Sequence, residues 1–408
     1  MHTTHLQRRK LLKGMGAISA LGAVGALSAI PFSKAIAASV AAPKMAVFLP
    51  RSSRYPTLSA EYLAGLRVGM AQTGVSPDAL MPIEYGAAPG VAIRQAQLLL
   101  GQQAVDVLTG VLCPSAALGL EPALRNSGTP LLVNDTGANR MPRVTQSGLI
   151  IRHSLEYWQS CAAFGHWAAS HLGKRAVLAM GNLEAGYDFP KAFRDSFSAN
   201  GGQTVGTHIS DMPHQPTEFS GLVQSIQEQQ PDFVYALYSG TQARRFLDFY
   251  RASGAASKVL LAGGGFMMGA DSHSSWRPEL SIASWHAAHQ SCTQFSSACD
   301  ATGLPVTPFS ILGYESGLRI ALAWVASNRQ ADAFSHGLQT QAATGPRAQR
   351  RYEQAAMESH GAHWIARSGT LPQELIKVSA ANPWRDLAYK PLQIQPAQNG
   401  WTNPYLVT

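Results

Sequence analysis

The chain has 408 residues, of which 14% are charged, and its formal net charge is +8. Residues 1–37 hold five basic residues and no acidic ones, so the 371 residues that follow carry only +3. This charge is small and dispersed, which argues against nucleic acid as a partner. The length suffices for two lobes, each with a hydrophobic core of ordinary size.

Residues 1–37 predict a twin-arginine export signal. The pair Arg8-Arg9 precedes a Gly-rich apolar stretch from Gly14 to Ile30, and Ala35-Ile36-Ala37 offers the small residues that a signal peptidase requires. A membrane anchor is the alternative, but a span needs about 20 strongly apolar residues. We therefore expect the twin-arginine translocase and signal peptidase to act on the chain and a mature, soluble periplasmic protein to begin near Ala38.

Short apolar runs then alternate with amphipathic stretches. Strands of four to eight residues separated by longer helices are typical of right-handed βαβ units and a parallel sheet. The predicted strands of this first block are Met45–Leu49, Met81–Tyr85, Val105–Leu112 and Pro130–Val133, and its helices are Leu58–Ala71, Val91–Leu100 and Ser115–Arg125.

The same alternation starts again after residue 155, which predicts a second doubly wound α/β lobe. The tail from Asn382 is rich in Pro, Gln and Asn and predicts irregular structure. The predicted helices of this second block are Trp158–His171, Phe189–Ala199, Phe219–Gln229 and Ala243–Ser253, and its strands are Ala176–Met180, Val205–Ile209, Phe233–Tyr238 and Val259–Ala262.

Ligands of open α/β sheets bind at the carboxyl ends of the strands. Two lobes with those ends facing each other would enclose a cleft, so the loops after the strands are the candidate site. Ser115 follows one such strand in the first turn of a helix, where free backbone N–H groups favour an anion such as a carboxylate. Ser115 could instead simply cap its own helix.

Several segments together resemble the type I periplasmic solute-binding proteins of the branched-chain amino acid and amide family, which serve ABC importers. The order and spacing of these segments carry the resemblance over residues 44–367. The segments are Leu49-Pro50 with Tyr55 and Glu61–Gly65, Gly110–Ser115, Pro130–Thr136, Gly186–Asp188 with Ala192-Phe193, Pro231–Gly240, and Gly345–Arg347 with Tyr352-Glu353.

The resemblance implies two lobes joined by a three-crossing hinge, with lobe I at 44–154 plus 289–344 and lobe II at 155–288 plus 345–408. It implies that Ser115, Thr136 and Ala138 meet the head group of the ligand. Aromatic residues near strand ends are candidate pocket walls or lobe packing, and Ser239 joins the predicted ligand-binding residues. The candidate walls are Tyr55, Tyr187, Tyr238, Phe266 and Tyr314.

Amino-acid binders of this family place an acidic residue after the last strand of the second lobe, where it pairs with the ligand ammonium. Here that stretch is Ala262-Gly-Gly-Gly-Phe266, which contains no acid. An unpaired ammonium buried in the cleft would be costly. The stretch therefore favours a carboxylate, amide or aromatic acid over a zwitterion. Its three glycines allow a ligand to approach the backbone closely, or allow a tight turn, but they lack the spacing of a nucleotide-binding loop.

Other chemistry is weakly indicated. A disulfide between Cys292 and Cys299 is possible if they do not share one helix, and Cys113 and Cys161 are expected to be buried thiols. The histidines have no metal-site spacing and are expected on the surface or the hinge, so no metal or cofactor is predicted. These histidines are His273, His286, His289, His360 and His363.

The sequence contains no G-x-S-x-G nucleophile elbow, and no catalytic residue is predicted. The predicted function is that of an exported solute-binding protein, not an enzyme, which captures a small organic ligand and delivers it to the permease of an ABC importer. A periplasmic sensing module for a signalling partner and a periplasmic enzyme are the alternatives.

Overall fold

The computed structural model describes residues 40–86, 88–137, 147–210, 218–268, 277–340, 344–353, 358–369 and 373–378. The predicted export signal, Ala138, His273 and the tail from Asn382 lie outside these ranges. No helix within them is long and apolar enough to cross a membrane.

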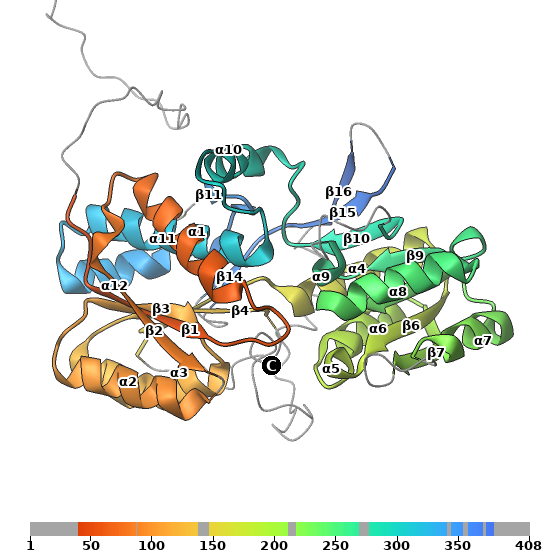
Figure 1. The fold of residues 1–408 in the computed structure, drawn as a ribbon, viewed down its shortest axis with the longest axis horizontal. Coiled ribbons are helices and arrows are strands. Elements are labelled where there is room, and N and C mark those ends of the chain that lie inside the picture. The colour runs from red at the N-terminus through yellow and green to blue at the C-terminus, as the bar shows by residue number, and fades with distance from the viewer. Residues whose placement is uncertain are drawn as a thin grey trace, which may run out of the picture. The chain divides into compact units, whose positions relative to one another are not determined.

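The first lobe is built on a sheet with the strand order β13-β14-β5-β4-β3-β1-β2, in which only the β13–β14 pair is antiparallel. Figure 1 shows α2 and α3 on one face of strands β1 to β3, and α1 with α11 on the other. The first elements of this lobe are β1 Met45–Pro50, α1 Leu58–Ala71, β2 Leu80–Gly86, α2 Pro89–Gly101, β3 Val107–Val111, α3 Pro114–Ser127, β4 Leu131–Asp135 and β5 Ile150–Ser154.

The chain enters the second lobe at residues 155–156, the first crossing, and leaves it at residues 284–289, the second crossing. The second lobe has a sheet of the same kind, with the order β16-β15-β10-β9-β8-β6-β7. Its strands from β7 to β10 are parallel, and β15 and β16 add antiparallel at one edge. Its elements up to the second crossing are α4 Tyr157–His171, β6 Arg175–Gly181, α5 Asn182–Ala185, α6 Phe189–Ala199, β7 Gln203–Ser210, α7 Ser220–Gln229, β8 Phe233–Leu237, α8 Gly240–Ala252, β9 Leu260–Gly263, α9 Gly265–Met268 and β10 Leu280–Ala283. The predicted fold class, two doubly wound α/β lobes, is confirmed.

The last third of the chain returns to the first lobe and then crosses once more. The prediction that residues from 345 onward belong to the second lobe is wrong for 351–360, because β14 pairs with β5 of the first sheet. The third crossing lies between His360 and His363, where β15 joins the second sheet. The other predicted lobe limits stay predictions. These late elements are α10 Thr293–Thr302, α11 Pro308–Ala326, α12 Ala331–Thr340, β11 Thr344–Gly345, β12 Ala348–Gln349, β13 Arg351–Glu353, β14 Glu358–His360, β15 His363–Arg367 and β16 Glu374–Val378.

Helices α1 and α11 pack so closely that their backbones nearly touch. A Cβ atom added to Gly69 of α1 would lie 2.1 Å from the carbonyl oxygen of Tyr314, and one added to Gly313 of α11 would lie 2.0 Å from that of Tyr62. Real Cβ atoms do not approach so closely, so only glycine fits at these positions. The pair forms one wall of the first lobe's core, behind β1 and β3.

Candidate functional site

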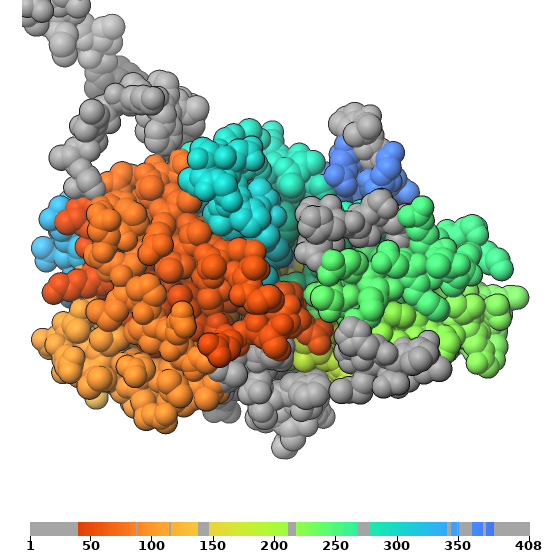
Figure 2. All heavy atoms as spheres, in the orientation of Figure 1, coloured from red at the N-terminus to blue at the C-terminus, as the bar shows by residue number. Residues whose placement is uncertain are grey.

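The loop after β1 reaches the second lobe through Arg54. The guanidinium Nη1 of Arg54 donates a hydrogen bond to Ser239 Oγ (2.8 Å) and lies 3.7 Å from Glu184 Oε1. The Ser239 hydroxyl donates in turn to the same carboxylate. These three residues, which we call the interlobe triad, lie at or just after the carboxyl ends of β1, β6 and β8. Figure 2 shows the red-orange atoms of the first lobe adjoining the green surface of the second.

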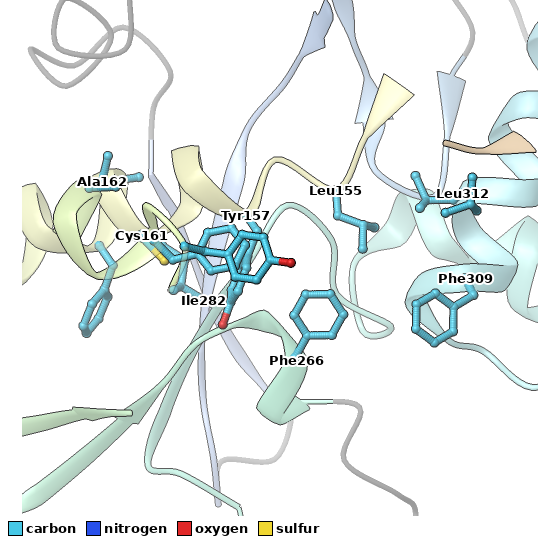
Figure 3. Packing of buried hydrophobic residues seen from close by; sticks show 14 of the residues in the cluster. Leu155, Tyr157, Cys161, Ala162, Phe266, Ile282, Phe309 and Leu312 are labelled. Carbon is cyan, nitrogen blue, oxygen red and sulfur yellow. The ribbon is translucent and has the colours of Figure 1, made fainter. Parts of the chain in front are cut away.

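Aromatic rings from both lobes meet at the same boundary. The ring centroid of Tyr55 lies 5.0 Å from that of Phe309 in α11 and 5.7 Å from that of Phe266 in α9. Phe266 also packs edge-to-face against Tyr157 of α4, at 5.0 Å. Figure 3 shows the Phe266 ring between Tyr157 on one side and Phe309 on the other. Such rings offer apolar faces to a small ligand.

A pocket opens beside these rings. It encloses about 260 Å³, including the part that is open to solvent. Its walls come from the second lobe, from two crossings and from the first lobe at Pro308. The lining residues are Leu155, Tyr157, Ser160, Gly265, Phe266, Ala283, Ser284, Trp285 and Pro308.

The glycines after β9 leave space for the side chain of Tyr157. A Cβ atom at Gly264 would lie 2.5 Å from the Tyr157 hydroxyl, so a larger residue there would push the ring away. The backbone N–H of Tyr157 donates to the carbonyl of Thr136 at 2.8 Å, which ties α4 to the end of β4. Burial raises the pKa of the Tyr157 hydroxyl well above its usual value, so the hydroxyl stays protonated and can donate. Gly264 therefore admits the side chain of Tyr157, and a close approach of these glycines to a ligand stays a prediction.

Two of the three predicted head-group residues, Ser115 and Thr136, lie in the part of the first lobe that the structure describes, whereas Ala138 lies outside it. Thr136 is buried directly after β4, next to Asp135, whose carboxylate accepts two hydrogen bonds from Arg152 at 2.8 and 2.9 Å. Ser115 lies in the first turn of α3, as predicted, after the N-cap residue Cys113. A role for these residues in binding a head group remains a prediction.

Three predicted tyrosine walls lie in the cores of their lobes. Tyr238 is fully buried, stacks on Phe246 at 4.2 Å and shares a hydrogen bond with Ser210 (2.7 Å). Tyr314 packs on Phe295 at 4.9 Å, between α11 and α10. Tyr187 is buried and stacks on Phe189. Of the predicted walls, the structure thus brings Tyr55 and Phe266 together at the boundary. It places Tyr187, Tyr238 and Tyr314 in the packing of the lobes.

Sequence reasoning missed four residues of this boundary: Arg54, Glu184, Tyr157 and Phe309. Arg54 and Glu184 both follow predicted strands, so the position of each at a strand end is a local signal that could have indicated it. Glu184 is an acid just after β6, although the sequence offered no acid after β9. Its contact with Arg54 joins positions 130 residues apart, which no local pattern reveals.

The cysteines and histidines form no second site in the described ranges. None of the four cysteines forms a disulfide, and all four are buried. Burial raises the pKa of the Cys292 thiol to about 12 and that of the Cys299 thiol to about 11. Cys299 lies within α10 while Cys292 precedes it, so the helix separates the two thiols. No group of three metal-ligating side chains occurs among these residues.

A family model for periplasmic binding proteins matches residues 43–316, two thirds of the chain. This chain belongs to the periplasmic binding protein family. A search of curated proteins gave no match.

Solved structures share the fold of this periplasmic binding protein. An ABC transporter substrate-binding protein from Sphaerobacter thermophilus is 20% identical, with a TM-score of 0.68 over 83% of this chain and 96% of that one. A solute-binding protein from R. palustris, in complex with benzoate, is 22% identical, with a TM-score of 0.65 and the same coverage. A leucine-binding protein from Thermotoga maritima is 13% identical, with a TM-score of 0.58 over 82% of this chain and 98% of that one.

A buried ionic cluster lies beside the first crossing of the binding protein. Arg347 is fully buried and donates to Glu315 through both its backbone N–H (3.0 Å) and its guanidinium (2.7 Å). The guanidinium also donates to the carbonyl of Ser154 and contacts His153 at 3.0 Å. This cluster therefore ties the end of β5 to α11 and to the β11–β12 hairpin.

A second ionic cluster joins the first and third crossings. Glu156 is fully buried at the start of α4 in a left-handed conformation (φ 55°), and its carboxylate pairs with Arg350 and lies 3.5 Å from His363. Ser284 of the second crossing donates to the carbonyl of Leu155 in the first, at 2.7 Å. The three crossings thus contact one another through buried polar groups.

We expect the binding protein to lose stability steadily as the pH falls from about 6.5 toward 2. Burial lowers the pKa of His153 to about 4, so in acid the unfolded chain gains a proton that the folded protein excludes. Burial alone would raise the pKa of Glu315, but Arg347 and His153 outweigh burial and lower that pKa to about 2. The contribution of Glu315 to the free energy of unfolding is therefore lost as the pH falls below about 4.5. Both groups bind more protons when unfolded, so stability rises with pH in this window.

Urea unfolding at a series of pH values measures this dependence. In His153→Gln we expect a smaller slope of the unfolding free energy between pH 6.5 and 4. Below that window the slope should fall by a lesser amount, because Arg347 still lowers the pKa of Glu315 but His153 no longer does. An identical slope in the variant and the wild type would show that His153 titrates alike in the folded and unfolded states.

Proposed function

We propose that this periplasmic binding protein captures a small organic ligand, amino-acid-like, amide or carboxylate, and delivers it to an ABC importer without transforming it. The observation that carries the proposal is the composition of the pocket, whose walls come from both lobes and from two crossings. A ligand seated there contacts both lobes only when they are closed, so binding shifts the population toward the closed form. A permease can then distinguish the loaded protein from the empty one.

Two features support a ligand with an apolar or aromatic body. Tyr157 and Phe266 line the pocket, and Phe266 adjoins Tyr55. The R. palustris structure holds benzoate and the Thermotoga maritima protein is described as leucine-binding, so this fold accommodates small acids of either kind.

We further propose that the chain reaches the periplasm through the twin-arginine translocase and loses residues 1–37 to signal peptidase. The paired arginines and the small residues before Ala38 support this route. N-terminal sequencing of the protein recovered from the periplasm tests the cleavage site.

The function is tested by small-angle scattering with a panel of amino acids, amides and aromatic acids. A fall in the radius of gyration with at least one compound is expected, and mass spectrometry of the purified protein should find a bound small molecule. No compaction with any compound of a broad panel, together with no co-purifying ligand, would refute the proposal.

Thr136→Ala is expected to weaken ligand binding by about 1–3 kcal/mol, because a buried polar partner of the ligand would go unmet. Titration calorimetry with the ligand found in the panel measures the change. Thr302→Ala serves as the control, since the Thr302 hydroxyl bonds only carbonyls of its own helix α10, at Ala298 and Cys299. Equal affinities in wild type and Thr136→Ala would remove Thr136 from the site.

A further inference from the structure

Glu184 is a completely buried carboxylate at the edge of the second lobe. It follows β6 in the short helix α5, and none of its surface is exposed. The Ser239 hydroxyl donates to it, but a hydroxyl leaves its negative charge in place. A buried carboxylate without a cation costs several kcal/mol, so Glu184 requires a positive partner in the closed protein.

That partner comes from the other lobe. Arg54 lies 3.7 Å from Glu184 and donates to Ser239 at 2.8 Å, so one guanidinium serves both members of the second lobe. The nearby cation Arg245 already pairs with Glu218 at 3.1 Å. Arg54 thus supplies the charge that Glu184 needs, and it can do so only while the lobes are together.

The position of Arg54 is built into the chain around it. Gly240, directly after Ser239, has a φ of 55°, and a Cβ atom there would lie 3.2 Å from Arg54 Cγ. The glycine therefore leaves room for the aliphatic stem of Arg54 at the start of α8. The two partners of Arg54 and this glycine come from two separate points of the second lobe, α5 and the start of α8.

We propose that Arg54 is a specificity-determining residue. It is a counter-ion of Glu184 that belongs to the protein itself, and it occupies the position beside this carboxylate that the cation of a ligand would otherwise take. The inference rests on the proposed ligand-binding function. A ligand without an ammonium group leaves the Arg54–Glu184 pair intact on closure. A ligand with one would bring a second cation to a carboxylate that already has Arg54 as its counter-ion, and the two cations would repel each other. The protein therefore selects carboxylates, amides or neutral rings over amines.

The electrostatics of the neighbouring tyrosines agree with this arrangement. Burial raises the pKa of Tyr187, and Glu184 raises it further while Arg54 lowers it. Burial is also the main cause that raises the pKa of Tyr157, which lines the pocket, and Cys161 and then Glu184 add to it. Geometry joins the two sites as well, because Tyr55, the neighbour of Arg54 in the chain, packs its ring 5.7 Å from that of Phe266 in the pocket wall.

The test uses benzylammonium, an aromatic cation without a carboxylate, as a probe in titration calorimetry. Arg54→Gln should bind it more tightly than the wild type by on the order of tenfold, the equivalent of about 1.4 kcal/mol. Arg54→Lys keeps the charge and should bind it no better than the wild type. Arg51→Gln is the matched control, because Arg51 lies in the same loop but is exposed, and it should also match the wild type.

The double variant Arg54→Gln/Glu184→Gln identifies the acceptor, since the gain should vanish with the carboxylate. The proposal is overturned if Arg54→Gln gains nothing, or if its gain survives in the double variant. Should Arg54→Gln fail to fold by circular dichroism, Arg54→Met carries the same test. Failure of the importer function would appear instead as wild-type protein that closes on no compound, a result independent of benzylammonium binding by the variants.

Discussion

Gly69→Ala should destabilise the protein by about 3 kcal/mol, at the upper end of the range for overpacked cores. The new methyl group would lie 2.1 Å from the carbonyl oxygen of Tyr314 and 2.9 Å from the backbone nitrogen of Leu318. Both are backbone atoms within α11, so no side chain can rotate out of the way. Relief requires α1 and α11 to move apart, which would open the core behind β1.

Chemical unfolding followed by circular dichroism gives the free energy of this change. Gly101→Ala is the matched control, because Gly101 ends α2 and a Cβ atom there meets nothing within 4 Å. Alanine favours the helix by up to about 1 kcal/mol over glycine, so the control should be neutral or slightly stabilised. Equal stability of the two variants would mean that α1 and α11 do not pack backbone to backbone.

Arg347→Met should cost about 3–5 kcal/mol, because it leaves a buried carboxylate without its cation. Arg347 has no exposed surface, and Glu315 is 4% exposed. The methionine would fill much of the space of the arginine stem. The lost free energy of unfolding therefore measures the missing charge and its hydrogen bonds more than the cost of a cavity. The carbonyl of Ser154 at the first crossing would lose its donor as well.

Adding Glu315→Gln to Arg347→Met should recover part of the loss, since the uncompensated charge disappears. Urea unfolding of the wild type, both single variants and the double variant gives the coupling free energy. Arg125→Met is the surface control, because Arg125 is 58% exposed and its pair with Glu121 should be worth less than about 1 kcal/mol. If Arg347→Met were no less stable than Arg125→Met, a structural role for the cluster would be contradicted.

The regular elements were predictable because their signals are local. The helices Leu58–Ala71 and Phe189–Ala199 match the predicted bounds, since a 3.6-residue apolar period and the residues at their ends lie within the segments themselves. The predicted third crossing was misplaced because β13 and β14 have three residues each, too short for an alternation to identify. Their assignment depends on β5, about 200 residues away.

The candidate site was predictable only as a set of loops. The loop after β1 was indicated, and it does reach the second lobe, but the residue that makes the polar contact is Arg54. Tyr238 and Tyr55 both follow strands, yet one is buried in a lobe core and the other meets Phe266 and Phe309. Which ring faces the boundary depends on the packing of helices from elsewhere in the chain, and proximity to a strand end does not encode it.

The left-handed residue at the first crossing constrains how the lobes move. Glu156 is not a glycine, so its backbone has few alternative angles, and its carboxylate is held by Arg350 and His363, which stand on either side of the third crossing. A change in the backbone angles of one crossing must then be accompanied by a change in the backbone angles of another. We therefore expect the two lobes to rotate as rigid bodies about one shared hinge axis. The three crossings should change their backbone angles together and not independently.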